Sequence, residues 1–199
     1  MLAAATLVDV AVAEERGWYV GAAVGMSEVD VSESLWRDAS VTEASLDAGD
    51  FGYQAWGGYR LHPHFAIEGG LIDLGEAIFS GRSSGDGSIW ELGPIEGRAR
   101  VRGMTVQAAA FWPARGRLQA YAKGGILLWS TSASYSATIN DINRFNDNGG
   151  TPTGGLGVQW RAWRGWWLRG EWQYLNVTFA GRQSVNASLA SIGVLHYLP

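Results

Sequence analysis

Four charged side chains lie in the middle of apolar or small-residue segments, away from any turn. They are Glu68 in "FAIEGGLIDLG", Lys123 in "YAKGG", and Arg169 and Glu171 in "WWLRGEWQY". Two carboxylates can act as general acid and base if a cleft admits a substrate. Here each carboxylate would share its surroundings with two cations, and burial of an unpaired charge is very costly. The composition of the group therefore favours ion pairs over catalysis.

The three histidines are the other residues that could carry chemistry. His62 and His64 flank Pro63 in a short turn and could approach a metal together, but no third ligand is evident nearby. His196 lies at the end of an apolar segment and has no serine two residues away to form a nucleophilic pair. We therefore expect no enzyme activity, no metal and no cofactor.

The segments that hold the four charges alternate in character with a period of two. In "GWYVGAAVGMS", residues 17–27, one face is Trp, Val, Ala, Val and Met, and the other is mostly Tyr, Gly, Ala and Ser. "GMTVQAAAFWP", "LGVQWRA" and "WWLRGEWQY" repeat this division, with Gln, Gly and isolated charges opposite the apolar face. The polar face therefore holds the four charges together with Gln107, Gln159 and Gln173. A soluble sandwich would instead expose Lys, Glu and Thr.

Eight such segments follow along the chain, and their connections alternate between short and long. Alternating segments of about ten residues, separated by turns, are typical of transmembrane barrels, which must close because lipid leaves no partner for a free strand edge. We predict an all-β fold, an eight-stranded antiparallel up-and-down transmembrane β-barrel. The expected strands are roughly 17–27, 51–61, 65–74, 98–112, 118–136, 152–162, 166–177 and 184–197. Long connections are expected near 28–50, 75–97, 137–151 and 178–183.

Tryptophan is unusually frequent, with 11 residues in the chain. Several tryptophans fall at the short-turn ends of the expected strands, where an interfacial aromatic girdle would lie in a membrane barrel. The alternative is that they form the core of a soluble fold, but two of them flank arginines in a tight turn. The expected interface residues are Trp18, Trp112, Trp160, Trp163, Trp166 and Trp172.

The length of 199 residues suits a single domain, which we expect at 17–198. Residues 1–13 contain an apolar stretch and a small-x-small sequence, and they are expected to be the remnant of a truncated signal peptide. The net charge of −4 argues weakly against nucleic acid as a partner. The sequence contains no run of about 18 apolar residues, so we expect no transmembrane helix.

The order and spacing of several motifs resemble the eight-stranded transmembrane domain of outer membrane protein A and its relatives, the OmpA-like barrels. "WYVGAAVGMS" resembles the first strand of that family, and "GGYRLHPHFAIEGGLIDLG" resembles its Gly-Gly-Tyr, turn Pro and x-Glu-x-Gly strand. "YAKGG", "GVQW", "RGEWQY" and "SLASIGVLHYL" are similar to later strands. The resemblance covers about Trp18 to Leu198, although the last residue is Pro199 where the family usually has Phe.

The resemblance implies a specific interior ion pair. In the family, the residues at the positions of Glu68 and Arg169 form a salt bridge that blocks or gates a narrow water path. A second family pair corresponds to Ala109 and Gln159 and is absent here. We expect one gate-like cluster around the first pair, completed by the other interior polar residues: Lys123, Glu171, Gln107, Gln159 and Gln173.

The resemblance also implies a place in the bacterial outer membrane, with both termini in the periplasm. The expected role is structural, in membrane integrity and in adhesion or recognition through the long loops. A small passive channel for ions or solutes, gated by Glu68 and Arg169, is the alternative. A soluble lipocalin-like binder would need a dry apolar interior, whereas a polar interior is expected here. The expected partners are outer-membrane lipid and lipopolysaccharide, periplasmic chaperones, the barrel-assembly machinery and a surface ligand of the loops.

Overall fold

The described part of the chain consists almost entirely of β-strands. The computed structural model describes residues 16–30, 41–47, 49–85, 92–136, 142–179 and 183–199, so the expected signal-peptide remnant lies outside it. Its strands are β1 (Gly17–Asp30), β2 (Val41–Asp47), β3 (Gly49–His62), β4 (Phe65–Ser83), β5 (Gly93–Trp112), β6 (Leu118–Ser136), β7 (Ile142–Trp163), β8 (Trp166–Phe179) and β9 (Gln183–Tyr197). Among these residues there is no helix long and apolar enough to cross a membrane.

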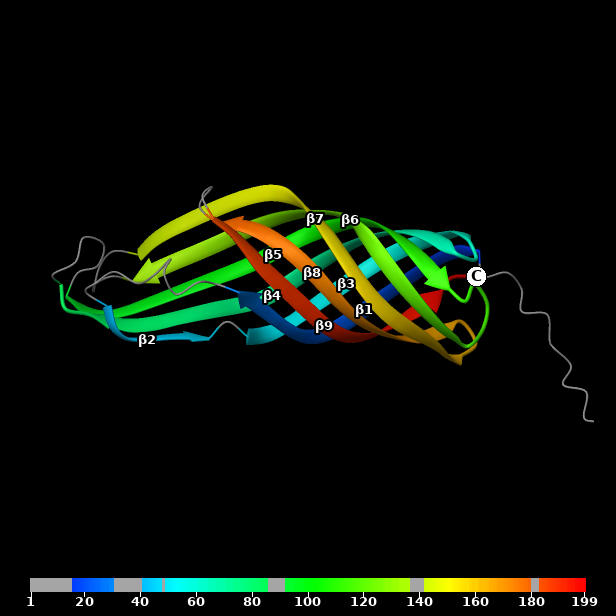
Figure 1. Ribbon diagram of the computed structural model, residues 1–199, viewed down its shortest axis with the longest axis horizontal. Helices are drawn as coiled ribbons and strands as arrows, with labels where there is room; N and C mark the ends of the chain where they lie inside the picture. Colours follow the sequence, from blue (N-terminus) through cyan, green and yellow to red (C-terminus); the bar gives the residue numbers. More distant parts are fainter. Residues whose placement is uncertain (1–15, 31–40, 48, 86–91, 137–141, 180–182) are drawn as a thin grey trace, which may run out of the picture.

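Eight of the strands close into one antiparallel barrel, which confirms the predicted fold class (Figure 1). The order around the barrel is β4-β3-β1-β9-β8-β7-β6-β5, and β5 pairs with β4 to complete the ring. The first and last strands meet with Tyr19 opposite Tyr197. Strand β2 lies outside this ring order and extends the edge of β4 beyond the end of β3, from Val41 opposite Ser83 to Asp47 opposite Ile78. Closure leaves no free strand edge in the region that faces lipid.

Side chains alternate between the outside and the interior along each strand. On β5, Met104, Val106 and Trp112 are exposed, whereas Gln107 and Ala109 are buried. The outward column of β6 is apolar or small from Leu118 to Leu128. Ten residues at about 3.4 Å each, tilted by about 40°, span about 26 Å along the barrel axis. This height agrees with the apolar band of about 25 Å that membrane barrels present to lipid.

One end of the barrel has short turns, and the other has strands that are longer than predicted. The turns lie at residues 63–64, 113–117 and 164–165, as expected. At the opposite end, which we call the long-strand end, β4, β5 and β7 occupy much of the regions expected as loops at 75–97 and 137–151. The β4–β5 ladder continues to Ser83 opposite Gly93, and its inward residues Phe79 and Ile95 stay buried. Ladder pairing and apolar packing thus continue past the apolar band, which the loop prediction did not anticipate.

The interior contains two layers of different character. Toward the long-strand end, apolar side chains pack across the barrel into what we call the apolar plug: Val29, Ile72, Leu74, Val101, Leu127, Trp129, Leu175, Val177, Val185, Ala187 and Leu189. Toward the turn end, polar and charged groups lie among aromatic rings. The expectation of a polar interior is therefore wrong for the long-strand half. The reason is that small and apolar residues on the inward face of several strands meet there once the barrel closes.

Candidate functional site

Two glycines make room for the aromatic rings that surround the interior charges. A methyl group at Gly58 on β3 would overlap the ring of Tyr19, and one at Gly157 on β7 would overlap the ring of Tyr121. Both tyrosines therefore lie flat against the barrel wall and direct their hydroxyl groups into the interior. Each hydroxyl reaches a carboxylate, as described next.

The first ion pair joins opposite walls of the barrel. Arg169 on β8 donates from Nη2 to Oε1 of Glu68 on β4 at 2.8 Å, and the Tyr19 hydroxyl donates to the same oxygen at 2.7 Å. Glu68 and Arg169 are each 2% exposed. None of the described residues accepts a hydrogen bond from the Nε or Nη1 atom of Arg169. The guanidinium lies 4.2 Å from the ring centre of Tyr121 and 5.1 Å from that of Trp56, and these cation–π contacts replace part of the lost solvation.

The second ion pair is adjacent and has more hydrogen-bond donors. Lys123 on β6 contacts Glu171 on β8, with Nζ 2.6 Å from Oε1. The Tyr121 hydroxyl donates to Oε2 of Glu171 at 2.5 Å, and Gln54 donates to Oε1 at 3.3 Å. Counting described residues, Glu171 thus accepts from three side chains, whereas Arg169 donates to one. Arg169 and Glu171 lie two residues apart on the same face of β8. The Arg169 side chain is therefore close enough to Glu171 to exchange its partner Glu68 for Glu171.

The three expected glutamines take different places. Gln107 lies directly opposite Glu68 in the β4–β5 ladder, and its amide nitrogen has no hydrogen-bond partner in the described part of the chain. Gln173 donates to the hydroxyl of Thr153 at 3.3 Å. Gln159 donates to Gln119 at 2.8 Å, nearer the turn end than the charges. The structure therefore arranges these side chains as several contacts along the interior rather than as one cluster.

Arg60 is an interior cation that the sequence reasoning missed. It is 1% exposed and lies above the Phe111 ring at 4.2 Å. Its guanidinium donates to the carbonyl of Pro63 at 2.5 Å, to the hydroxyl of Tyr197 at 2.9 Å and to Gln119 at 3.2 Å. Its position on the same strand face as Gln54 and Gly58 was the signal that could have identified it. It binds neutral oxygens and thereby closes the turn end of the interior.

All six expected interface tryptophans are exposed on the outside of the barrel. Trp163 and Trp166 oppose each other at the turn between β7 and β8, and Trp18 contacts Tyr59 with ring centres 5.1 Å apart. Trp112 and Trp160 are also close to the turn end. Trp172 differs, because it lies further along β8 beside Tyr174, toward the long-strand end. Three other tryptophans, Trp56, Trp129 and Trp167, are buried in the interior instead.

The histidines make ring contacts rather than a recognisable site. His62 and His64 stack in the first turn with ring centres 5.6 Å apart, and His196 lies 4.6 Å from Trp166. Within the described residues, no three His, Cys, Asp or Glu side chains are grouped closely enough to hold a metal ion.

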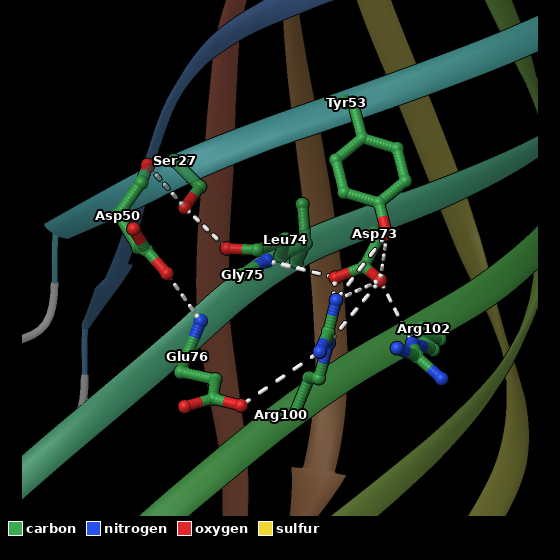
Figure 2. Close-up of polar contacts among 9 residues, drawn as sticks. All are labelled: Ser27, Asp50, Tyr53, Asp73, Leu74, Gly75, Glu76, Arg100 and Arg102. Atoms are coloured by element: carbon green, nitrogen blue, oxygen red, sulfur yellow. Dashed lines mark hydrogen bonds and ion pairs between the residues drawn. The ribbon is translucent and has the colours of Figure 1, made fainter.

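A second polar cluster lies on the outside of the barrel, just beyond the apolar band, and was also missed (Figure 2). Asp73 on β4 accepts hydrogen bonds from the Tyr53 hydroxyl, the Gly75 amide, Arg100 and Arg102, at 2.7 to 3.2 Å. Burial opposes ionisation of this carboxyl, but the hydrogen bonds prevail and lower its pKa to about 2. The alternation Arg98-x-Arg100-x-Arg102 on one strand face was the signal available in the sequence.

Comparisons with known proteins agree with this geometry. The sequence profile of the OmpA-like transmembrane domain matches residues 13–197. No curated protein sequence is significantly similar to the chain. Among solved structures, Neisserial surface protein A is similar at 13% identity with a TM-score of 0.56, over 92% of this chain and 97% of that one.

Two further structures show the same architecture. The attachment invasion locus protein Ail of Yersinia pestis has 12% identity and a TM-score of 0.53, over 92% of this chain and 99% of that one. Ail has also been solved in complex with the heparin analogue sucrose octasulfate. OprG from Pseudomonas aeruginosa has 12% identity and a TM-score of 0.51, over 92% and 98% of the two chains. At these identities the likeness shows a shared fold.

Proposed function

The chain belongs to the family of OmpA-like transmembrane domains, and on that premise we propose that it is a structural outer-membrane barrel that also offers a surface for recognition. In this proposal the turn end and both termini face the periplasm, and the long-strand end faces the outside of the cell. No reaction is assigned to the interior. The observation that carries the proposal is the filling of the interior along the barrel axis.

The two interior layers would prevent water from passing. In the turn-end half, Arg60, Glu68 and Arg169 are almost fully buried and bind groups from other strands. In the long-strand half, Leu127, Leu175 and Leu189 are at most 1% exposed within the apolar plug. Eight strands leave an interior about wide enough for side chains alone. An ion would have to displace the charges and then enter a dry apolar layer, which is costly.

The long-strand end supplies the surface for recognition. The β4–β5 and β6–β7 ladders continue beyond the apolar band, so the strands themselves would project from the membrane. Such projecting strands favour contact with a surface ligand or a neighbouring cell. The structurally similar Ail has been solved with a heparin analogue, and an anionic surface polymer is therefore one class of ligand to test. Lipid and lipopolysaccharide surround the barrel, and periplasmic chaperones and the assembly machinery deliver it.

A small passive channel is the second candidate, and one observation favours it. Within the described ranges, Arg169 uses only one of its three guanidinium nitrogens in hydrogen bonds, and Glu171 lies two residues away on the same strand face. Movement of Arg169 from Glu68 to Glu171 would open the contact between the two walls. The apolar plug would also have to rearrange, and for this reason the structural role is preferred.

Planar-bilayer recording with the refolded chain separates the two functions. The wild type and Glu68→Ala are both expected to show no steady conductance, because the apolar plug remains in place. Conductance in the wild type that rises in Glu68→Ala would refute the structural role and support the gated channel. Gln107→Ala is the matched control, because it removes a neighbouring interior side chain without removing a charge. Incubation with lipopolysaccharide, followed by mass spectrometry of the acyl chains, tests the absence of catalysis.

A further inference from the structure

Three arginines alternate along the outer face of β5, where the apolar band ends. Arg102 is the next outward residue beyond Met104, and Arg100 and Arg98 follow in steps of two. In the neighbouring strands Met104 is opposite Leu71 and Leu128, so the band ends at one level across three strands. The exterior therefore changes from apolar to cationic within a single step along the strand.

Internal contacts use only part of the donor capacity of these arginines, and Figure 2 shows the contacts of Arg100 and Arg102. Arg100 is engaged, because its Nε and Nη2 bind Asp73 and its Nη1 lies 3.7 Å from Glu76. Arg102 contributes only its Nε to Asp73, at 2.7 Å, and its side chain is 60% exposed. In the described part of the chain, Arg98 has no hydrogen-bond or ion-pair partner. The terminal nitrogens of Arg102 and the whole guanidinium of Arg98 can thus bind a ligand, while Asp73 holds Arg100 and Arg102 in place.

A column of serines on β6 accompanies the arginines. In the β5–β6 ladder, the outward pairs are Arg102 with Ser130, Arg100 with Ser132, and Arg98 with Ser134. The Ser130 and Ser132 side chains are exposed and make no hydrogen bond to another described residue. Guanidinium and hydroxyl donors side by side are suited to an oxyanion with several acceptor oxygens, of which a phosphate group is the common biological example. Glu96 lies beyond Arg98 on the same face and limits the stripe at its far end.

We propose that this arginine–serine stripe binds the phosphate groups of a phosphorylated lipid of the outer leaflet. The acyl chains of that lipid would lie on Met104, Leu128 and the apolar surface below. Continuity with the apolar band favours a lipid over a free anion, because one ligand can occupy both surfaces. Arg98 and Arg102 are about 13 Å apart along the strand, which allows each to hold a separate phosphate. The proposal rests on the orientation proposed above, which places this rim in the outer leaflet.

Native mass spectrometry of the folded barrel, released from detergent micelles, tests the proposal. The barrel is titrated with bis-phosphorylated lipid A, with the same lipid after removal of both phosphates, and with inorganic phosphate as a competitor. Arg98→Gln and Arg102→Gln are each expected to weaken binding of the phosphorylated lipid about tenfold, and the double variant about a hundredfold. Arg164→Gln, an exposed arginine in the turn between β7 and β8, is the matched control and should change affinity less than about twofold.

The other outcomes overturn the proposal. Equal binding of the phosphate-free lipid would show that the arginine–serine stripe does not recognise the phosphate groups. Displacement of the lipid by equimolar inorganic phosphate would identify a free-anion site, and equal weakening by Arg164→Gln would show non-specific attraction. Folding of each variant is checked by heat-modifiable migration on a gel, and Arg98→Gln keeps the test valid if Arg102→Gln does not fold. Bilayer conductance tests the proposed function independently, so either idea can fail alone.

Discussion

Replacement of Glu68 by alanine should strongly destabilise the barrel, because it isolates a buried cation. Among the residues that the structure describes, Glu68 is the single hydrogen-bond acceptor of the Arg169 guanidinium, and it also accepts from the Tyr19 hydroxyl. Arg169 is 2% exposed, so water cannot replace the lost acceptor without rearrangement. The variant therefore leaves one buried charge and one buried hydroxyl without partners.

The magnitude follows from the groups that remain. Breaking a buried ion pair by removing one partner costs about 3–5 kcal/mol. The rings of Tyr121 and Trp56 still face the guanidinium, and cation–π contacts contribute on the order of 2 kcal/mol in desolvated sites. These contacts still stabilise the unpaired guanidinium in the variant, so the expected cost lies at the lower end of that range. We expect Glu68→Ala to lower the free energy of unfolding by about 3 kcal/mol.

Urea unfolding in lipid vesicles, followed by tryptophan fluorescence and by gel migration, measures this quantity. The Glu68→Met/Arg169→Met double variant removes both charges, and it should recover much of the stability lost in Glu68→Ala, because no unpaired charge remains and only the Tyr19 hydroxyl still lacks its acceptor. Gln107→Ala, which lies opposite Glu68 and loses no charge, should cost about 1 kcal/mol or less. A coupling energy below about 1 kcal/mol between the two charged positions would refute the reasoning.

Three further predictions concern other parts of the barrel. Gly125→Ala should cost about 2 kcal/mol or more in urea unfolding, because its methyl group would overlap a backbone carbonyl of β5. Gly124→Ala should stay within about 0.5 kcal/mol, because its methyl group would make only an ordinary contact with the Thr153 carbonyl at 3.8 Å. Lys123→Met should destabilise less than loss of Glu68, by about 2 kcal/mol in the same assay, because its carboxylate partner keeps two other donors. In an NMR titration that follows its carboxyl carbon, Asp73 should show a pKa near 2. In Arg100→Gln this pKa should rise toward 3.8. Since the folded pKa lies below the unfolded value, the stabilisation is complete above pH 3.8 and is lost as the pH falls toward 2.

Much of the barrel could be predicted because its signal is local. An alternation of period two identifies a strand and its two faces from ten residues, without knowledge of its neighbours. The turns at 63–64 and 164–165 likewise followed from short breaks in that alternation. The interior position of Glu68 and Arg169 was available from the same parity. Where the alternation was interrupted, as near Gly75 with its positive φ of 78°, the prediction placed a loop although β4 continues to Ser83.

The sequence by itself therefore determined the class of fold, the strand faces and the presence of inward charges of both signs. The tertiary structure alone decided which side chains meet across the interior, because this depends on strand tilt and stagger after closure. Glu68 and Arg169 are 101 residues apart in the chain and meet only when β4 and β8 form opposite walls. Closure likewise gathered the apolar plug from several strands and placed Asp73 beneath the arginines of β5. Parity is a property of one strand, whereas contact across a barrel is a property of all eight.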